Sequence, residues 1–444
     1  MSQNSCPLPM STPQAPLIDD QDSKHNLVQP QNDVVLEQSL NILETVLNFF
    51  GFFQISIFTT LLSWVVFISL AIALPVLRAN FLHCSHCEKF EIQTFDLQVA
   101  VFQAISAAIS LVCISHNLRK YGLRKLLFVD RHHGYVYQFR EQYMQRIKIF
   151  YRFLGSWFTV CLLLKIAREL ARLMIYVDGG SWWQSIVIFF VSLLSWTYTT
   201  LIFLLGTALF NLVGNLQVIH FENYGKLLEK DLDVSVYIEE HMRLTNYLSK
   251  ISHRFRLFLL LQFLFVSVCQ FITLLQTTEN QSFVNFINAG DFAVLTIVQI
   301  VGLVFCLSAA AKLSHRAQGL GSVASRWHAL VTCNSGDAPP SFSANNSGIL
   351  NDANQMGSYF ASCSESDLES FDNQAYPTIN HTQITSVMST YHKRQAFVAY
   401  VQSNTGGFTI FGWLFDRVLV NTIFFIELSF VMFVLGKTIA IPVR

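Results

Sequence analysis

Long apolar segments alternate with polar segments along this chain. Seven of them have about the 20 residues that a helix needs to cross a hydrocarbon core of ~30 Å. They cover residues 55–77, 97–118, 153–176, 185–212, 257–278, 292–311 and 418–436. The pattern predicts an all-α polytopic membrane protein with seven transmembrane helices. A lipid bilayer is therefore the first partner that we expect.

The composition supports a membrane protein and excludes several other classes. Of the 444 residues, 52% are apolar and 13% are charged, whereas a soluble domain usually has about 25% charged residues. Lys+Arg and Asp+Glu both number 29, so the formal net charge is zero. That balance lacks the overall basic surface of a nucleic-acid-binding protein. Nine scattered cysteines are too few for a disulfide framework.

The distribution of Lys and Arg predicts the orientation of the spans, because cytoplasmic links are enriched in these residues. The link between spans two and three holds nine of them, the link between spans four and five holds six, and the region 312–394 holds five. We therefore expect a cytoplasmic N-terminus and an extracellular C-terminus. This orientation is opposite to that of a G-protein-coupled receptor. The sequence does not distinguish the plasma membrane from an endomembrane.

Four regions follow from these patterns. Residues 1–40 are expected to form a disordered cytoplasmic tail. Residues 41–333 are expected to hold spans one to six with cytoplasmic helical extensions. Residues 334–390 are expected to form a disordered acidic cytoplasmic linker, and residues 391–444 the seventh helix and a short external tail. Helical periodicity in the link 212–256 predicts long helices, which either pack into an intracellular domain or lie as separate surface helices.

Glu427 lies at the centre of the seventh span, where an ionisable residue is costly and often functional. Helical spacing puts apolar residues on the same face, namely Val420, Ile423 or Phe424, Val431 and Val434. If this face lined a water-filled path, Glu427 would attract cations. The alternative is a protonated or hydrogen-bonded Glu427 that holds helices together.

A second polar feature lies in the middle and outer half of span three. Lys165, Arg168, Glu169 and Arg172 follow one another at spacings that put them on one stripe, where Glu169 can pair with Lys165 or Arg172. The stripe is a candidate ligand pocket, and Trp182 and Trp183 at the mouth of span four would line it. The alternative is an internal ion-pair network.

Other candidate chemistry is weaker. Cys84 and Cys87 lie on the external side and either form a disulfide or stay unpaired; a zinc site would need a second ligand pair. The sequence contains no HExxH, P-loop or GxSxG motif. We therefore expect a protein that is not an enzyme and that needs neither a cofactor nor a metal.

Five stretches carry a resemblance to a known family. They are RKYGLRKLLFVD (Arg119–Asp130), LQVIHFENYGKLLEKD (Leu216–Asp231), EEHMRLTNYLSKISHRFRLFLLLQF (Glu239–Phe263), AAKLSHRAQ (Ala310–Gln318) and KRQAFVAYVQSNTGGFTIFGWLFDRVLVNTIFFIELSFVMFVLGKTI (Lys393–Ile439). They resemble a plant family of seven-span proteins that is distantly related to insect odorant and gustatory receptors. The seventh-span pattern of gustatory receptors matches at Thr422 and Phe430 and departs at Ile423, Glu427 and Ser429.

The resemblance implies a homotetramer whose seventh helices surround one pore, a cytoplasmic anchor domain formed by helices four to seven, and a ligand pocket in the outer half of the bundle. From it we expect a ligand-gated cation channel of the chemoreceptor type, with an unknown small-molecule ligand. The alternative is a non-channel scaffold that docks partners on residues 212–256 and 334–380.

Overall fold

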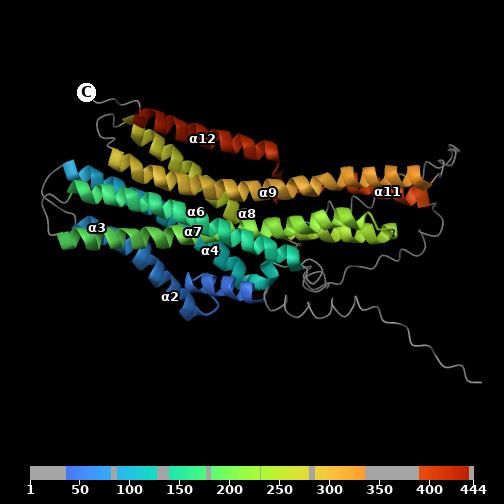
Figure 1. Cartoon of the computed structure of the whole chain (residues 1–444), viewed down its shortest axis with the longest axis horizontal. Coiled ribbons are helices and arrows are strands. Elements are labelled where there is room, and N and C mark those ends of the chain that lie inside the picture. The colour runs from blue at the N-terminus through green and yellow to red at the C-terminus, as the bar shows by residue number, and fades with distance from the viewer. Residues whose placement is uncertain are drawn as a thin grey trace, which may run out of the picture.

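A computed structural model shows an almost entirely helical protein (Figure 1). The residues that it describes are 37–81, 88–127, 140–176, 182–230, 232–279, 286–335 and 390–439. The predicted disordered tail falls largely in residues 1–36, outside the described residues, and residues 37–49 already form a helix. Most of the predicted acidic linker also lies outside them.

Helix boundaries follow the apolar segments closely. The first span consists of α2 (Ile57–Ile68), the π-helical turn η1 (Ser69–Ala73) and α3 (Leu74–Phe81). The π turn comes just before Pro75, which has no N–H to continue the α-helical hydrogen bonds. The next two long helices are α4 (Glu88–Leu127), which is broken at Gly122, and α6 (Arg140–Tyr176).

The second half of the chain forms the longest helices. They are α7 (Trp182–Leu227), α8 (Val234–Glu279) and α9 (Phe286–Ser335), and they are followed by α11 (Thr390–Ser403) and α12 (Arg417–Ile439). A small antiparallel hairpin of β1 (Thr409–Ile410) and β2 (Trp413–Leu414) joins α11 to α12. Positive φ angles at Phe411 and Gly412 form its tight turn.

Six helical segments are long and apolar enough to cross a membrane within the described parts of the chain. They are Ile57–Arg78, Leu97–Leu127, Glu141–Met174, Ser185–Leu227, Val234–Ile272 and Val294–Cys333. The chain is therefore a multi-pass membrane protein. The predicted seventh span coincides with α12, whose 23 residues extend about 34 Å at 1.5 Å per residue.

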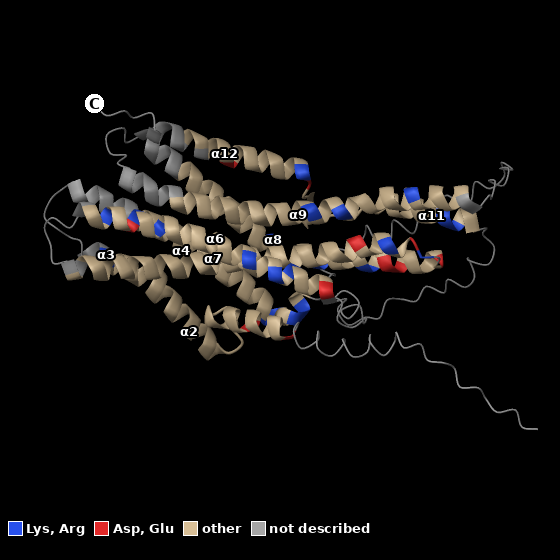
Figure 2. Ribbon diagram, in the orientation of Figure 1, with Lys and Arg blue, Asp and Glu red and all other residues tan. Residues whose placement is uncertain are grey.

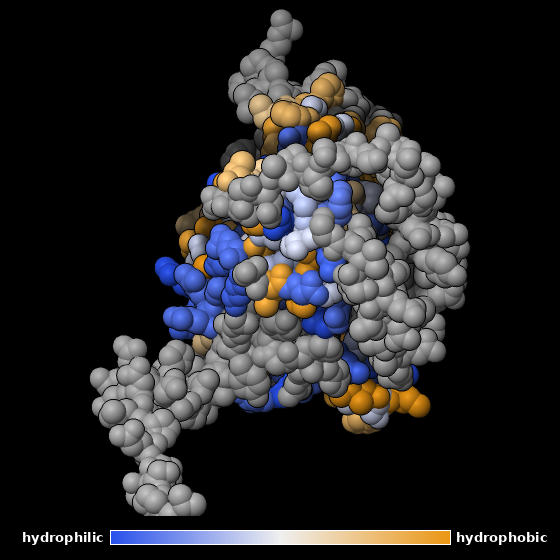
Figure 3. Space-filling view, turned by 90° about the vertical axis from the view of Figure 1, so that its right-hand side faces the viewer, coloured by the Kyte–Doolittle hydropathy of each residue, from blue (hydrophilic) through white to orange (hydrophobic). Residues whose placement is uncertain are grey.

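Three helices are much longer than a bilayer is thick. α7, α8 and α9 have 46, 46 and 50 residues, so each is about 70 Å long or more. Beyond the other helices they continue to one end of the molecule, where α11 packs beside them (Figure 1). We call this end the extended end. Most of the charged residues in the described part of the chain lie toward it (Figure 2), and the described residues visible there are largely hydrophilic (Figure 3).

The helices at the extended end pack around buried aromatic side chains, not as separate surface helices. Tyr237 of α8 is fully buried, and its ring lies 5.5 Å from Trp327 of α9 and 5.8 Å from Phe397 of α11 between centroids. Next to it, the buried His241 ring lies 5.5 Å from Tyr400 and 6.0 Å from Tyr224. These contacts join four helices into one unit.

Small residues allow the central helices to approach closely. A Cβ atom added to Gly302 of α9 would lie 2.5 Å from the Phe203 ring of α7, and one added to Gly206 of α7 would lie 2.9 Å from Ser110 of α4. Glycine at such positions is typical of helix packing in membranes. α7 is thus the central helix, in extensive contact with α9, α4 and α6.

Candidate functional site

The polar stripe of span three forms a buried ion-pair network. Glu169 is 4% exposed, and its Oε1 lies 2.9 Å from Lys165 Nζ and 2.9 Å from Arg168 Nη1. It also accepts a hydrogen bond of 3.1 Å from Ser192 of α7. Arg78 of α3 donates a 2.6 Å hydrogen bond to Ser192 and lies 4.0 Å from Glu169. One carboxylate therefore connects α3, α6 and α7.

This geometry matches the ion-pair alternative for Lys165, Arg168 and Glu169, whose side chains are all buried. The side chain of Arg172 contributes to the electrostatic field at Glu169. Trp183 is 63% exposed, and the side chain of Trp182 lies outside the described residues. In this arrangement the polar side chains of the stripe contact one another and Ser192, so a ligand would have to displace some of these contacts.

Glu427 lies between α12 and α8. Its side chain is 3% exposed, and its Oε1 accepts a 2.5 Å hydrogen bond from Ser267 of α8. Its Oε2 is buried and has no hydrogen-bond partner among the described residues. Glu427 therefore links α12 to α8.

The helix face that carries Glu427 is the inner face of α12. Ile423 is buried on it, and Val420 and Phe424 are half-buried; the side chains of Val431 and Val434 lie outside the described residues. The opposite face is open, with Val418 70%, Phe425 62% and Met432 62% exposed. The sequence predicts a pore along the Glu427 face, whereas within this chain that face packs against other helices, with Glu427 hydrogen-bonded to α8. Helical spacing identifies residues that share a face but does not reveal which face packs against the rest of the chain.

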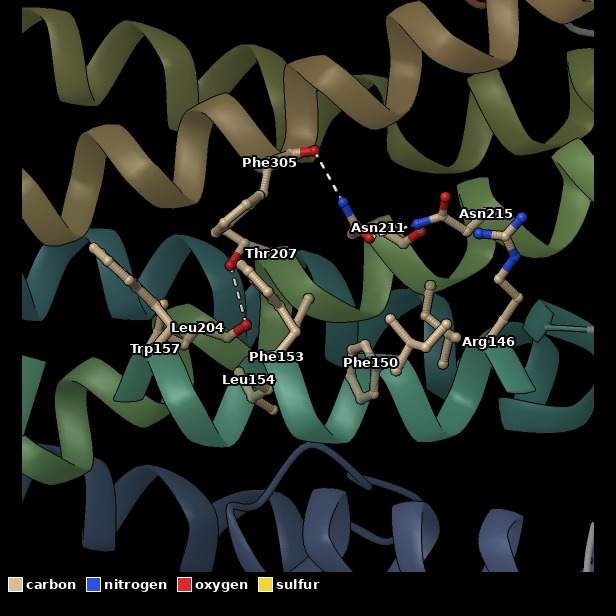
Figure 4. Close-up of a pocket in the computed structure, with 13 residues that line it drawn as sticks. Arg146, Phe150, Phe153, Leu154, Trp157, Leu204, Thr207, Asn211, Asn215 and Phe305 are labelled. Atoms are coloured by element: carbon tan, nitrogen blue, oxygen red, sulfur yellow. Dashed lines mark hydrogen bonds between the residues drawn. The ribbon is translucent and has the colours of Figure 1, made fainter. Parts of the chain in front are cut away.

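An open pocket lies between α6, α7 and α9, nearer the extended end than the Glu169 network. The empty space within and in front of it amounts to about 760 Å³ when the open solvent there is counted. It is lined by Arg146, Ile149, Phe150, Phe153, Leu154, Trp157, Leu204, Thr207, Ala208, Asn211, Leu212, Asn215 and Phe305. Figure 4 shows Arg146 and Asn215 at one end of this pocket and Trp157 at the other.

This pocket is not among the sites that the sequence predicts. Asn211 donates a 3.1 Å hydrogen bond to the Phe305 carbonyl, and Asn215 donates one of 2.6 Å to the Asn211 side chain. Two features of the sequence could have indicated the pocket. Asn211 and Asn215 are four residues apart at the end of the fourth apolar segment, and Phe150, Phe153 and Trp157 follow one another at helical spacing near the start of the third.

The two alternatives for the external cysteines, a disulfide or unpaired thiols, remain predictions. Cys84 and Cys87 lie outside the described residues. Where the structure does describe the chain, no group of three or more His, Cys, Asp or Glu side chains could hold a metal ion.

Comparison with known proteins identifies the family of this chain. A family profile described as "Protein of unknown function (DUF3537)" matches residues 38–426. The chain belongs to this family. The match covers α2 to α9, α11, the hairpin and the first part of α12. A comparison with curated proteins finds no match.

Proposed function

We propose that this member of the DUF3537 family is a ligand-gated cation channel of the chemoreceptor type, in which four copies assemble with α12 innermost. The observation that carries the proposal is the open face of α12. This 23-residue helix is peripheral in the subunit and has its main contacts with α8 and α9. A second copy could cover the open face, and several copies around an axis could enclose a path.

The open face combines apolar and polar side chains. Beside the exposed Val418, Phe425 and Met432, it presents Asn421, Thr422 and Ser429. The hydroxyls of Thr422 and Ser429 donate to carbonyls one turn earlier in the same helix. Their oxygens remain able to accept hydrogen bonds from water, which suits the wall of a narrow wet path.

Glu427 has a modified role in this proposal. Its carboxylate lies behind the proposed wall, so it does not contact the permeating ion. If ionised, a carboxylate on the far side of the same helix would still make the electrostatic potential in the path more negative and favour cations. Its hydrogen bond from Ser267 also holds α12 against α8, so this contact is a candidate link between helix packing and opening of the path.

The Glu169 network is the candidate site for the ligand. It connects α3, α6 and α7 through Arg78 and Ser192, so a polar or anionic small molecule that competed for these cations would shift the three helices relative to one another. A ligand changes a conformational equilibrium only if it binds one arrangement of the helices more tightly than the other, and competition for these cations would provide that difference.

Subunit stoichiometry tests the proposal before any ligand is known. The protein is extracted directly into lipid nanodiscs, and the mass of single particles is measured. We expect particles of four subunits. Particles with a single subunit would refute the pore and would favour the alternative of a membrane scaffold that docks partners at its extended end. If tetramers are found, cation flux into liposomes is the second measurement.

A further inference from the structure

The pocket between α6, α7 and α9 is a separate site from the Glu169 network, and it is elongated along α6. Arg146 and Trp157 are eleven residues apart on α6, which corresponds to about 16 Å along the helix. One leaflet of a ~30 Å hydrocarbon core is ~15 Å thick. The pocket therefore extends along α6 by the thickness of one leaflet, from a charged end to an aromatic end.

The walls and the rim suit an alkyl chain. Phe150, Phe153, Leu154 and Leu204 line the pocket, and the Phe153 and Phe305 rings meet edge to face at 4.5 Å between centroids. At the rim, Ile149 and Phe153 are 50% and 47% exposed, so the pocket opens sideways, toward the lipid around the bundle. An occupant could enter from the membrane without crossing the protein.

The mouth of the pocket that lies nearest the extended end of the molecule is basic. Arg146 is half-buried there, and no hydrogen bond or ion pair to it is found among the described residues. Lys312, which follows the apolar part of α9, lies within electrostatic range of both Arg146 and Glu222. Arg316, one turn farther along α9, forms a 3.1 Å ion pair with Glu222. An anion between Arg146 and Lys312 would relieve their mutual repulsion.

The opposite end contains an unused donor. The indole Nε1 of Trp157 is buried and has no hydrogen-bond partner in the described structure, although buried Trp N–H groups usually have one. In the described part of the chain, neither Arg146 at one end of the pocket nor the Trp157 N–H at the other has a polar partner from the protein. An acyl chain offers no acceptor to this N–H, so the basic mouth and the apolar walls are what indicate a lipid as the occupant.

We infer that this pocket binds one anionic phospholipid of the leaflet at the extended end, with its phosphate at Arg146 and Lys312 and one acyl chain along Phe150, Phe153 and Trp157. Basic residues at a membrane boundary are the usual partners of anionic headgroups. The length of the pocket and its lateral opening favour a membrane lipid over a water-soluble anion. The inference does not depend on whether the protein conducts ions.

Native mass spectrometry of the full-length protein tests the inference, with vesicles that contain equal amounts of phosphatidylglycerol and phosphatidylcholine. We expect the wild type to retain one phosphatidylglycerol through delipidation. Arg146→Gln should lower that preference about fivefold, the effect of one basic residue near an anionic surface. Arg152→Gln is the matched control, because Arg152 is exposed, lies on the same helix and does not line the pocket.

Ala208→Trp, which fills the pocket from α7, should reduce retention of both lipids while the monodisperse elution of the protein is kept. An equal loss of preference in Arg146→Gln and Arg152→Gln would mean that only general surface charge attracts the lipid, and would overturn the site. Unchanged retention in a well-folded Ala208→Trp protein would also overturn it. Since neither readout involves current or stoichiometry, failure here is distinguishable from failure of the channel proposal.

Discussion

Replacing Glu169 by Gln tests whether the outer network holds the bundle together. The Glu169 carboxylate is 4% exposed and has two cationic nitrogens at 2.9 Å. Gln has a similar shape and can keep an oxygen in place, so the change removes the charge and little of the packing. Removing one partner of a buried ion pair costs about 3–5 kcal/mol. We expect a loss of that size in the free energy of unfolding.

The assay is unfolding of the purified protein in mixed micelles by increasing amounts of SDS, followed by tryptophan fluorescence. Glu37→Gln provides the control, because Glu37 pairs with Arg124 on the surface, where the two side chains are 55% and 37% exposed. An exposed pair of this kind contributes about 0–1 kcal/mol. If Glu169→Gln and Glu37→Gln destabilise the protein equally, the network does not stabilise the helix packing and our reasoning is refuted.

Three further predictions concern other parts of the fold. Gly302→Ala should destabilise the protein by about 1–3 kcal/mol through overpacking against Phe203, whereas Gly225→Ala, which meets nothing within 4 Å, should not; thermal unfolding compares them. His241 lies near the start of α8 at the extended end, outside the predicted span 257–278, and burial lowers its pKa from 6.5 to about 4. Because the unfolded state then binds the proton more tightly, stability should fall by up to about 3 kcal/mol as the pH drops from 6.5 to 4, and His241→Gln should remove this dependence. In tetrameric particles, Glu427→Gln should reduce cation preference in liposome flux without changing stoichiometry; unchanged preference would exclude an electrostatic role for Glu427.

The membrane spans could be predicted from the sequence because each is a continuous apolar segment, and the six confirmed spans begin or end within the segments predicted. The spacing of Lys165 and Glu169 also predicted a contact, since residues four apart on a helix are neighbours. Helical spacing within one segment could not predict which residues of other helices contact this network. Arg78 and Ser192 are 114 residues apart, and only the packing of α3 against α7 brings them together.

Two other features depend on tertiary structure. The hairpin before α12 has strands of only two residues each, too short for an alternating pattern; it is held by hydrogen bonds from the Phe408 and Thr409 amides to Ser314 and Ser252. The pocket at Arg146 required knowledge of which face of α6 meets α7 and α9. In both cases the local sequence is compatible with several neighbours, and the packing selects one.

The central claim is that α12 meets α12 of neighbouring copies. Benzoylphenylalanine, a photo-crosslinking derivative of phenylalanine, placed at position 425 in native membranes tests it most directly, because Phe425 is 62% exposed on the open face. The same residue at position 58, where Phe58 of α2 is 73% exposed, is the control for contact with lipid. Illumination should produce covalent dimers and larger species from position 425 and none from position 58. Chains that stay uncrosslinked at both positions would contradict the account.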